Sequence, residues 1–193
     1  MGGEALAAKE ISESERYRKG QAYKNPLAGN PGRDPEYSVG VKAADGATVN
    51  VANPTATRVA LACMNMNAVM GGAACHWGGP SAYAEIMSSI YGIMFRSDDF
   101  LTDYNFLNDA GHAENGLYAL KANYGYAALT WEDLKGFRSI ESKLTGHGES
   151  HLFGEGVMVS NGPLGSSAPI AQGLAMADRL ANNARTTICV ISD

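Results

Sequence analysis

The segment that decides the fold runs from Leu134 to Ala181 and reads LKGFRSIESKLTGHGESHLFGEGVMVSNGPLGSSAPIAQGLAMADRLA. It predicts a short polar helix, a loop rich in Gly and His, a brief strand over Val157–Ser160, a tight turn over Asn161–Gly165 and then an amphipathic helix. We expect the buried stripe of that last helix to contain the apolar residues spaced by four, three and four positions: Ile170, Leu174, Ala177 and Ala181.

The turn and the helix start carry further signals. Glycines flank Pro163-Leu164, so a ligand can approach the backbone there, because no Cβ stands in the way. Ser166 and Ser167 offer hydroxyl groups at the start of the helix, and Pro169 falls in its first turn, where a missing N–H costs nothing. Further upstream, Thr130 is expected to cap a helix that opens with Trp131-Glu132-Asp133-Leu134, whose acidic residues suit the helix dipole.

The same segment resembles the thiamine-diphosphate-binding domain of transketolases. The pieces FRSIESKLTGHGE, GPLG and A-x-GLA occur here in the order of the family segments FR…SK…GHPE, TTGPLGQG and A-x-GMA. Two upstream pieces agree: His76-Trp77-Gly78 matches the H-x-G of an SGHPG turn, and Gly111-His112 follows an apolar run, as in F-V-L-S-x-GH. Cys75 and Trp77 depart from the Gly and Pro of that turn. The resemblance covers about Thr57 to Asp193.

The resemblance implies an α/β fold, a three-layer helix/parallel-sheet/helix thiamine-diphosphate-binding fold that is incomplete in this chain. Residues 57–193 would form the first half of that domain. Residues 1–56 would be an N-terminal extension with a charged helix over residues 4–23, a loop rich in Pro and Gly over Lys24–Tyr37, and a hairpin turning at Asp45-Gly46.

Within the domain, the apolar patterns predict helices over Thr57–Ala74, Ser81–Phe95 and Ala113–Tyr124, a strand over Tyr104–Leu107 and a final strand in TTICVISD. The methionines of the first helix are interpreted as core packing rather than as part of a cofactor site. One side of that helix is expected to collect Val59, Ala62, Cys63, Met66, Val69 and Met70.

By the same resemblance, His76 and His147 would act as catalytic residues that contact substrate hydroxyls around the reacting carbonyl, and His112 would lie near the cofactor's diphosphate. Neutral imidazole suits these roles, because it can donate to one group and accept from another near pH 7. The backbone of Gly162, Pro163 and Leu164 would hold the cofactor in its bent form. Asp193 would be a ligand to Mg²⁺ (or Ca²⁺), which takes oxygen ligands.

These roles require the three imidazoles and the turn to converge around one hollow. His151 has no counterpart in the family and is expected to be an exposed loop residue. The implied activity is that of a transketolase: transfer of a two-carbon ketol unit from a ketose phosphate to an aldose phosphate. The chain would need partners for it, either the remaining part of a longer chain or a second subunit, in an expected homodimer.

Two alternatives remain open from the sequence. One is another thiamine-diphosphate enzyme, such as deoxyxylulose-phosphate synthase or dihydroxyacetone synthase. The other is a degenerate domain that serves as a non-catalytic binding or assembly module.

Composition and spacing restrict the other function classes. The 193 residues are 45% hydrophobic and carry a formal charge of -5, which gives no general attraction to nucleic acid or to an anionic membrane. No apolar run approaches the roughly 20 residues of a membrane span, and the N-terminus lacks the plan of a secretory signal, so a cytoplasmic location is expected. Three widely spaced cysteines indicate reduced thiols rather than a zinc site. Phosphate-binding loops of nucleotide sites and the G-x-S-x-G hydrolase elbow are absent from the sequence.

Overall fold

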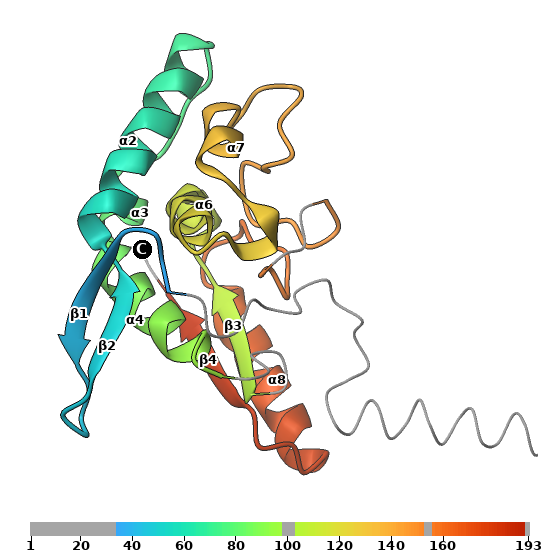
Figure 1. Cartoon of the computed structure of the whole chain (residues 1–193). Helices are drawn as coiled ribbons and strands as arrows, with labels where there is room; N and C mark the ends of the chain where they lie inside the picture. The colour runs from blue at the N-terminus through green and yellow to red at the C-terminus, as the bar shows by residue number, and fades with distance from the viewer. Residues whose placement is uncertain (1–33, 98–102, 153–155, 192–193) are drawn as a thin grey trace, which may run out of the picture.

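The computed structural model describes residues 34–97, 103–152 and 156–191. The helix expected over residues 4–23, most of the following loop and Asp193 therefore lie outside the described residues. The helices and strands, in chain order, are β1 (Ser38–Lys42), β2 (Thr48–Ala52), α2 (Pro54–Met70), α3 (Gly78–Ala82), α4 (Ala84–Met94), β3 (Tyr104–Asn108), the 3-10 helix η1 (Gly111–Ala113), α6 (Glu114–Asn123), the 3-10 helix η2 (Tyr126–Ala128), α7 (Trp131–Lys135), α8 (Ser167–Leu180) and β4 (Thr186–Val190) (Figure 1).

A parallel strand pair separates two helical layers, so the expected incomplete α/β fold is confirmed. β3 and β4 run in register from Tyr104↔Thr186 to Asn108↔Val190. Alternate side chains of a strand point to opposite faces. Phe106 and Val190 accordingly lie in the core cluster formed with residues of α4 and α6. The opposite face meets α8, where the Asn105 amide donates to the Asp178 carboxylate at 2.6 Å.

The hairpin expected around Asp45-Gly46 is confirmed by the antiparallel pairing of β1 with β2. Gly46 has φ +82°, a left-handed conformation that glycine adopts readily and that such a turn requires. The hairpin packs closely against α4. A Cβ at Gly92 of α4 would lie only 2.4 Å from a methyl group of Val51 in β2. Glycine is thus required for this close approach of β2 and α4.

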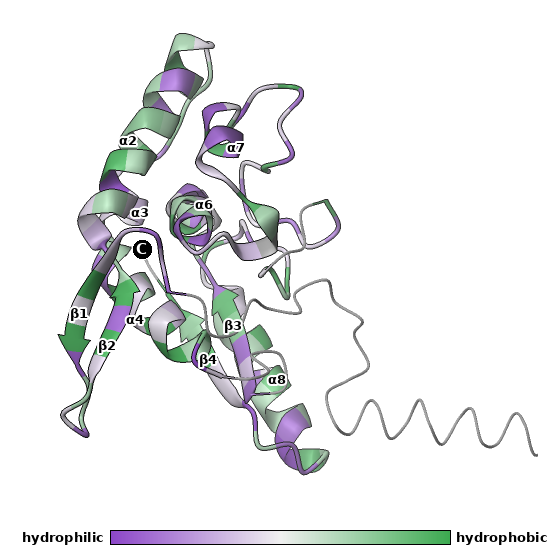
Figure 2. Cartoon of the chain, viewed as in Figure 1, coloured by the Kyte–Doolittle hydropathy of each residue, from purple (hydrophilic) through white to green (hydrophobic). Residues whose placement is uncertain are grey.

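The first long helix begins earlier than predicted and buries another face. Asn53 caps it by accepting from the Thr55 amide, and Pro54 occupies its first turn, so α2 starts three residues before Thr57. The residues that α2 buries are Thr57, Leu61, Met64, Asn65 and Ala68. The predicted apolar side is exposed instead: Met66 is 64% exposed and Met70 is 84% exposed. Of the three methionines of α2, only Met64 packs in the core as expected. Figure 2 shows why the pattern misleads, since hydrophobic residues occur along most of α2.

Two predictions in the deciding segment are wrong. Val157–Ser160 is not a strand, and among the described residues the parallel sheet contains only β3 and β4. In place of strand pairing, this segment bonds through a side chain: the Ser160 hydroxyl accepts from the Ser150 amide at 3.1 Å. None of the residues in the predicted stripe of α8 is buried: two are exposed and two are half-buried. α8 instead buries Ser167, Ala171 and Asp178 on the side that meets β3 and β4.

The remaining helices surround α6, whose ten residues are all buried. α6 contacts α2 and α7 (Figure 1) and occupies almost the range expected for it. The predicted cap of α7 is confirmed, because Thr130 and Asp133 bond reciprocally in a capping box. The helix expected over Ser81–Phe95 is divided into α3 and α4 at Tyr83. No helix in the described ranges is long and apolar enough to cross a membrane.

Candidate functional site

The three predicted histidines meet at the carboxyl end of β3. The ring centroids of His76 and His112 lie 4.8 Å apart, at an interplanar angle of 48°. Gly111 joins the third histidine to the turn: a Cβ there would lie 2.6 Å from Cδ2 of His147 and 3.0 Å from the amide nitrogen of Gly162. The convergence expected from the sequence is therefore present. We call His76, His112 and His147 the histidine cluster.

Two asparagines hold the backbone at His76. Asn65 of α2 and Asn115 of α6 donate their side-chain amides to the His76 carbonyl at 2.8 and 2.9 Å. The Asn115 amide also donates to the Asn65 side-chain oxygen at 3.1 Å. The turn before α3 is thereby tied to two packed helices. Sequence reasoning missed both asparagines. Asn65 gave a signal, as a polar side chain within an apolar run, whereas Asn115 lies between Glu114 and Gly116 and gave none.

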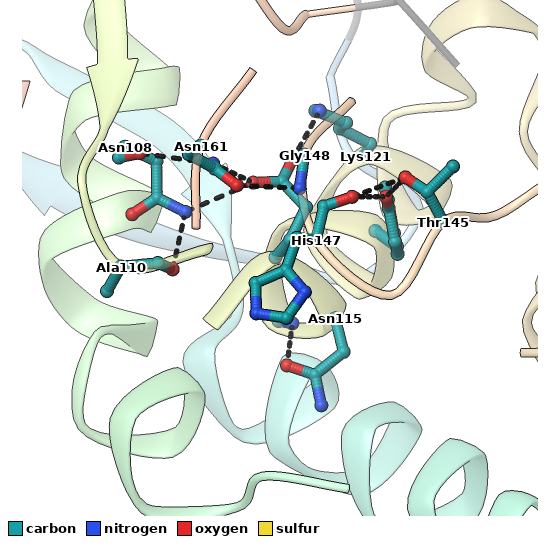
Figure 3. Close-up of polar contacts among 11 residues, drawn as sticks. Asn108, Ala110, Asn115, Lys121, Thr145, His147, Gly148 and Asn161 are labelled. Atoms are coloured by element: carbon teal, nitrogen blue, oxygen red, sulfur yellow. Dashed lines mark hydrogen bonds and ion pairs between the residues drawn. The ribbon is translucent and has the colours of Figure 1, made fainter. Parts of the chain in front are cut away.

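The loop that carries His147 is held from α6 and from the turn. The Tyr118 hydroxyl lies 2.8 Å from the Thr145 hydroxyl, which in turn donates to the His147 carbonyl. The next backbone amide, that of Gly148, donates to Oδ1 of Asn161 at 2.7 Å, and the Asn161 backbone amide donates back to the Gly148 carbonyl at 2.8 Å. Figure 3 shows the Asn161 side chain between Asn108 and Gly148.

The start of α8 is capped by a residue from another part of the chain. The expected hydroxyl caps are not formed: the Ser166 hydroxyl donates to the Pro163 carbonyl at 2.6 Å, within the turn. Asp109, which is fully buried, instead accepts from the amides of Gly165 and Ser167 at 2.6 and 2.8 Å. Burial opposes the charge on Asp109, but these hydrogen bonds outweigh it and lower its pKa.

The turn presents an open face beside the histidine cluster. Gly162 has φ +143°, which L side chains rarely adopt, and a Cβ there would meet no atom within 4 Å. Leu164 is 53% exposed. The backbone of the turn is therefore accessible to a ligand, as the flanking glycines indicate.

The surroundings of His76 favour its neutral form. Although His76 is exposed, partial desolvation lowers its pKa below the usual 6.5, and electrostatic interactions with His112, Arg138 and His147 lower this pKa further. At neutral pH this imidazole can therefore both donate and accept a hydrogen bond. His151 is exposed, as expected, and lies 3.8 Å from the Glu149 carboxylate.

A buried ion pair lies behind the cluster, and the sequence analysis did not single it out. The Glu114 and Lys121 side chains, 1% and 0% exposed, are 3.3 Å apart within α6. Oε2 of Glu114 also accepts from the side-chain amides of Asn108 at 3.0 Å and Asn161 at 3.3 Å. The Asn161 side chain donates further to the Asn108 carbonyl at 3.1 Å.

The structure offers no metal site within its described parts. No group of three His, Cys, Asp or Glu side chains there is placed to hold an ion. Asp193, the predicted ligand, lies outside the described residues.

The fold and the cluster together define an α/β domain with polar side chains gathered just beyond the carboxyl end of a parallel strand, the usual ligand position in open α/β sheets. Residues 55–188 match the family described as "Transketolase, thiamine diphosphate binding domain". The chain belongs to that family.

The curated relatives agree with this assignment. A transketolase of Cereibacter sphaeroides is 28% identical over 138 residues, covering 69% of this chain and 21% of the relative. Transketolase 2 of Escherichia coli is 35% identical over 124 residues, covering 62% and 18%. One of the subunits of apulose-4-phosphate transketolase from Actinobacillus succinogenes is 30% identical over 142 residues, covering 72% and 49%. The match thus spans about a fifth of the two transketolases and about half of the Actinobacillus polypeptide. No solved structure matches the chain.

Proposed function

We propose that this chain contributes half of the cofactor-binding region of a transketolase, which moves a two-carbon ketol unit from a ketose phosphate to an aldose phosphate. The observation that carries the proposal is the meeting of three imidazoles and the open turn at Gly111. Thiamine diphosphate, when bound, would supply the carbanion chemistry that breaks and forms the carbon–carbon bond.

The described residues fit such a cofactor. An extended molecule with a diphosphate and two rings needs hydrogen-bond donors at one end and accessible backbone at the other. A Cβ at Gly162 would meet no atom within 4 Å, which leaves room for a ligand beside the backbone of this residue. We propose that Gly162, Pro163 and Leu164 contact the cofactor through their backbone and that His112 donates to its diphosphate. Asp193 would contribute one carboxylate to Mg²⁺ beside that diphosphate.

His76 and His147 are proposed to bind the sugar phosphate. At both histidines a side chain bonds the backbone carbonyl, so the backbone that carries each imidazole is held without a ligand. Such fixed donors and acceptors can orient the hydroxyls next to the reacting carbonyl and hold or return a proton there. The lowered pKa of His76 supports its use as a neutral donor and acceptor at physiological pH.

The remaining parts of the site are proposed to come from another polypeptide segment. The match to a relative whose name describes it as one subunit favours a two-subunit enzyme over one long chain. The further metal ligands and the group that activates the cofactor would then lie on the companion polypeptide. We expect the whole assembly to be a homodimer of such pairs.

Calorimetry tests the proposal directly. The chain, alone and with the rest of its natural protein, is titrated with thiamine diphosphate and Mg²⁺. We expect binding by the assembled protein that weakens about tenfold or more in His112→Ala. The assembled protein should also convert xylulose 5-phosphate with ribose 5-phosphate as acceptor. If the assembled protein does not bind thiamine diphosphate, the enzymatic proposal is wrong and an assembly role replaces it.

A further inference from the structure

Burial of the pair Glu114–Lys121 is weak evidence that the pair stabilises α6. Removing two charges from water is expensive, and apolar side chains of similar size often do as well or better. Both side chains are almost fully buried, and the Lys121 ammonium also lies 5.7 Å from the centre of the Tyr118 ring. The other contacts of the Glu114 carboxylate indicate what further role it has.

The contacts of Glu114 point outward from α6 to the site. Oε1 faces Lys121, while Oε2 accepts from the side-chain amides of both Asn108 and Asn161. With its amide nitrogen bound to the carboxylate, the Asn161 side chain has its oxygen directed at the backbone amide of Gly148. The carboxylate, together with the Asn108 carbonyl that the same amide nitrogen bonds at 3.1 Å, thus determines which way the Asn161 side-chain amide faces.

Asn161 links the two loops of the site. It directly precedes the turn at Gly162, and Gly148 directly follows His147. The paired hydrogen bonds between Asn161 and Gly148 fix the spacing between the imidazole of His147 and the turn. A rotated Asn161 side chain would place its own N–H group against the N–H group of Gly148, and the two loops would separate.

We propose that Glu114 is a positioning residue, which acts through Asn161 to fix His147 relative to the ligand-binding turn. The Lys121 ammonium donates to Oε1 of Glu114, which leaves Oε2 to accept from both asparagines. The inference rests on the proposed function only for its consequence, the affinity for thiamine diphosphate. The positioning itself can be measured without any ligand.

The test separates positioning from stability. In the full chain, Glu114→Met with Lys121→Met replaces the ion pair by apolar side chains of similar length, which should preserve folding. Glu114→Gln with Lys121→Met restores one acceptor oxygen. We expect the backbone amides of Gly148 and Asn161 to exchange with solvent about tenfold faster or more in the first variant, and the second to restore most of the protection.

A matched control excludes a general loss of stability. Asp178→Asn weakens the contact between Asp178 of α8 and Arg185, the residue before β4. This contact belongs to another network, so the Gly148 amide should stay protected relative to the rest of the chain. Asn161→Ala leaves the ion pair intact and should expose the Gly148 amide as strongly as the double-Met variant. Normal Gly148 exchange in Asn161→Ala or in the double-Met variant overturns the proposal. If the double-Met variant fails to fold, Glu114→Leu with Lys121→Leu takes its place, and faster or normal Gly148 exchange in that variant supports or overturns the proposal.

Titration with thiamine diphosphate and Mg²⁺ gives the second readout. Affinity in the assembled protein should fall about tenfold in the double-Met variant and recover with glutamine. Unchanged affinity beside faster exchange would overturn the functional part of the inference. Absence of binding by the unmodified protein would instead refute the proposed function, while the exchange result would still decide whether Glu114 positions the loop.

Discussion

The carboxylate of Asp109 accepts a hydrogen bond from the Ser167 amide at 2.8 Å, across 58 residues of chain. Its other oxygen accepts from Gly165, so one buried side chain joins the end of β3 to the start of α8. Asn in place of Asp109 offers only one acceptor oxygen. We expect Asp109→Asn to lower the free energy of unfolding by about 1.5–3 kcal/mol at pH 7, measured by urea denaturation.

The pH dependence of this loss has a definite sign. The pKa of Asp109 is lowered in the folded protein, so its stabilisation is complete above the unfolded value of 3.8 and disappears as the pH falls through the folded value. The difference in stability between the two proteins should therefore shrink below about pH 4. A difference that persists unchanged well below that pH would contradict the role given to Asp109.

The pair His76–His112 makes a second prediction. His112→Gln removes one electrostatic interaction that lowers the pKa of His76, so this pKa should rise in an NMR titration. The rise should be partial, because burial is the largest cause of the lowered value and persists in the variant. His151→Gln, at an exposed position, serves as the control and should leave His76 unchanged. If His76 has the same pKa in the unmodified chain, in His112→Gln and in His151→Gln, the rings of His76 and His112 do not lie in contact.

Gly111 provides a steric test of the convergence. A Cβ there would lie 2.4 Å from Oδ1 of Asn161 and 2.6 Å from His147, so Gly111→Ala must separate the loops. We expect a loss of about 1–3 kcal/mol in thermal unfolding and weaker binding of thiamine diphosphate. Gly173→Ala is the matched control, since no atom lies within 4 Å of its Cβ, and it should be neutral or stabilising by up to about 1 kcal/mol. Equal stability of the two variants would refute the close approach.

The orientation of α2 is tested by two truncations of similar size. Leu61 is fully buried, and Leu61→Ala should reduce the free energy of unfolding by about 2–5 kcal/mol. Met66 is 64% exposed, and Met66→Ala should change it by no more than about 0.5 kcal/mol. Chemical denaturation of the isolated chain distinguishes the two faces, and the reverse order of losses would restore the face predicted from the sequence.

Local chemistry explains which elements could be predicted. The cap at Thr130 and the turn at Asp45-Gly46 depend on residues close in the chain, and both form as expected. The meeting of the histidines was predicted from the family resemblance alone, because the three turns lie far apart in the sequence. The strand over Val157–Ser160 failed because a strand needs a neighbour to pair with, and local propensity cannot supply one.

The other failures have physical causes of the same kind. Apolar residues occur on every side of α2, so Leu61 and Met66 look alike in the sequence although only Leu61 is buried. Asp109, Glu114 and Asn161 bond to residues distant in the chain. Nothing in their local pattern separates a buried acceptor from a solvated one.

The hydrogen bonds between the hairpin region and the end of α6 have a practical consequence for shortened versions of the chain. Tyr37 and Asn123 exchange two hydrogen bonds, of 2.7 and 2.8 Å, and the Ala52 amide donates to the Tyr124 hydroxyl at 3.1 Å. A chain that starts at residue 55, where the family match begins, would lack Tyr37 and Ala52, which bond the end of α6. Aromatic residues of the core cluster would then be exposed. We expect such a product to precipitate, whereas one that starts at residue 34 should stay in solution.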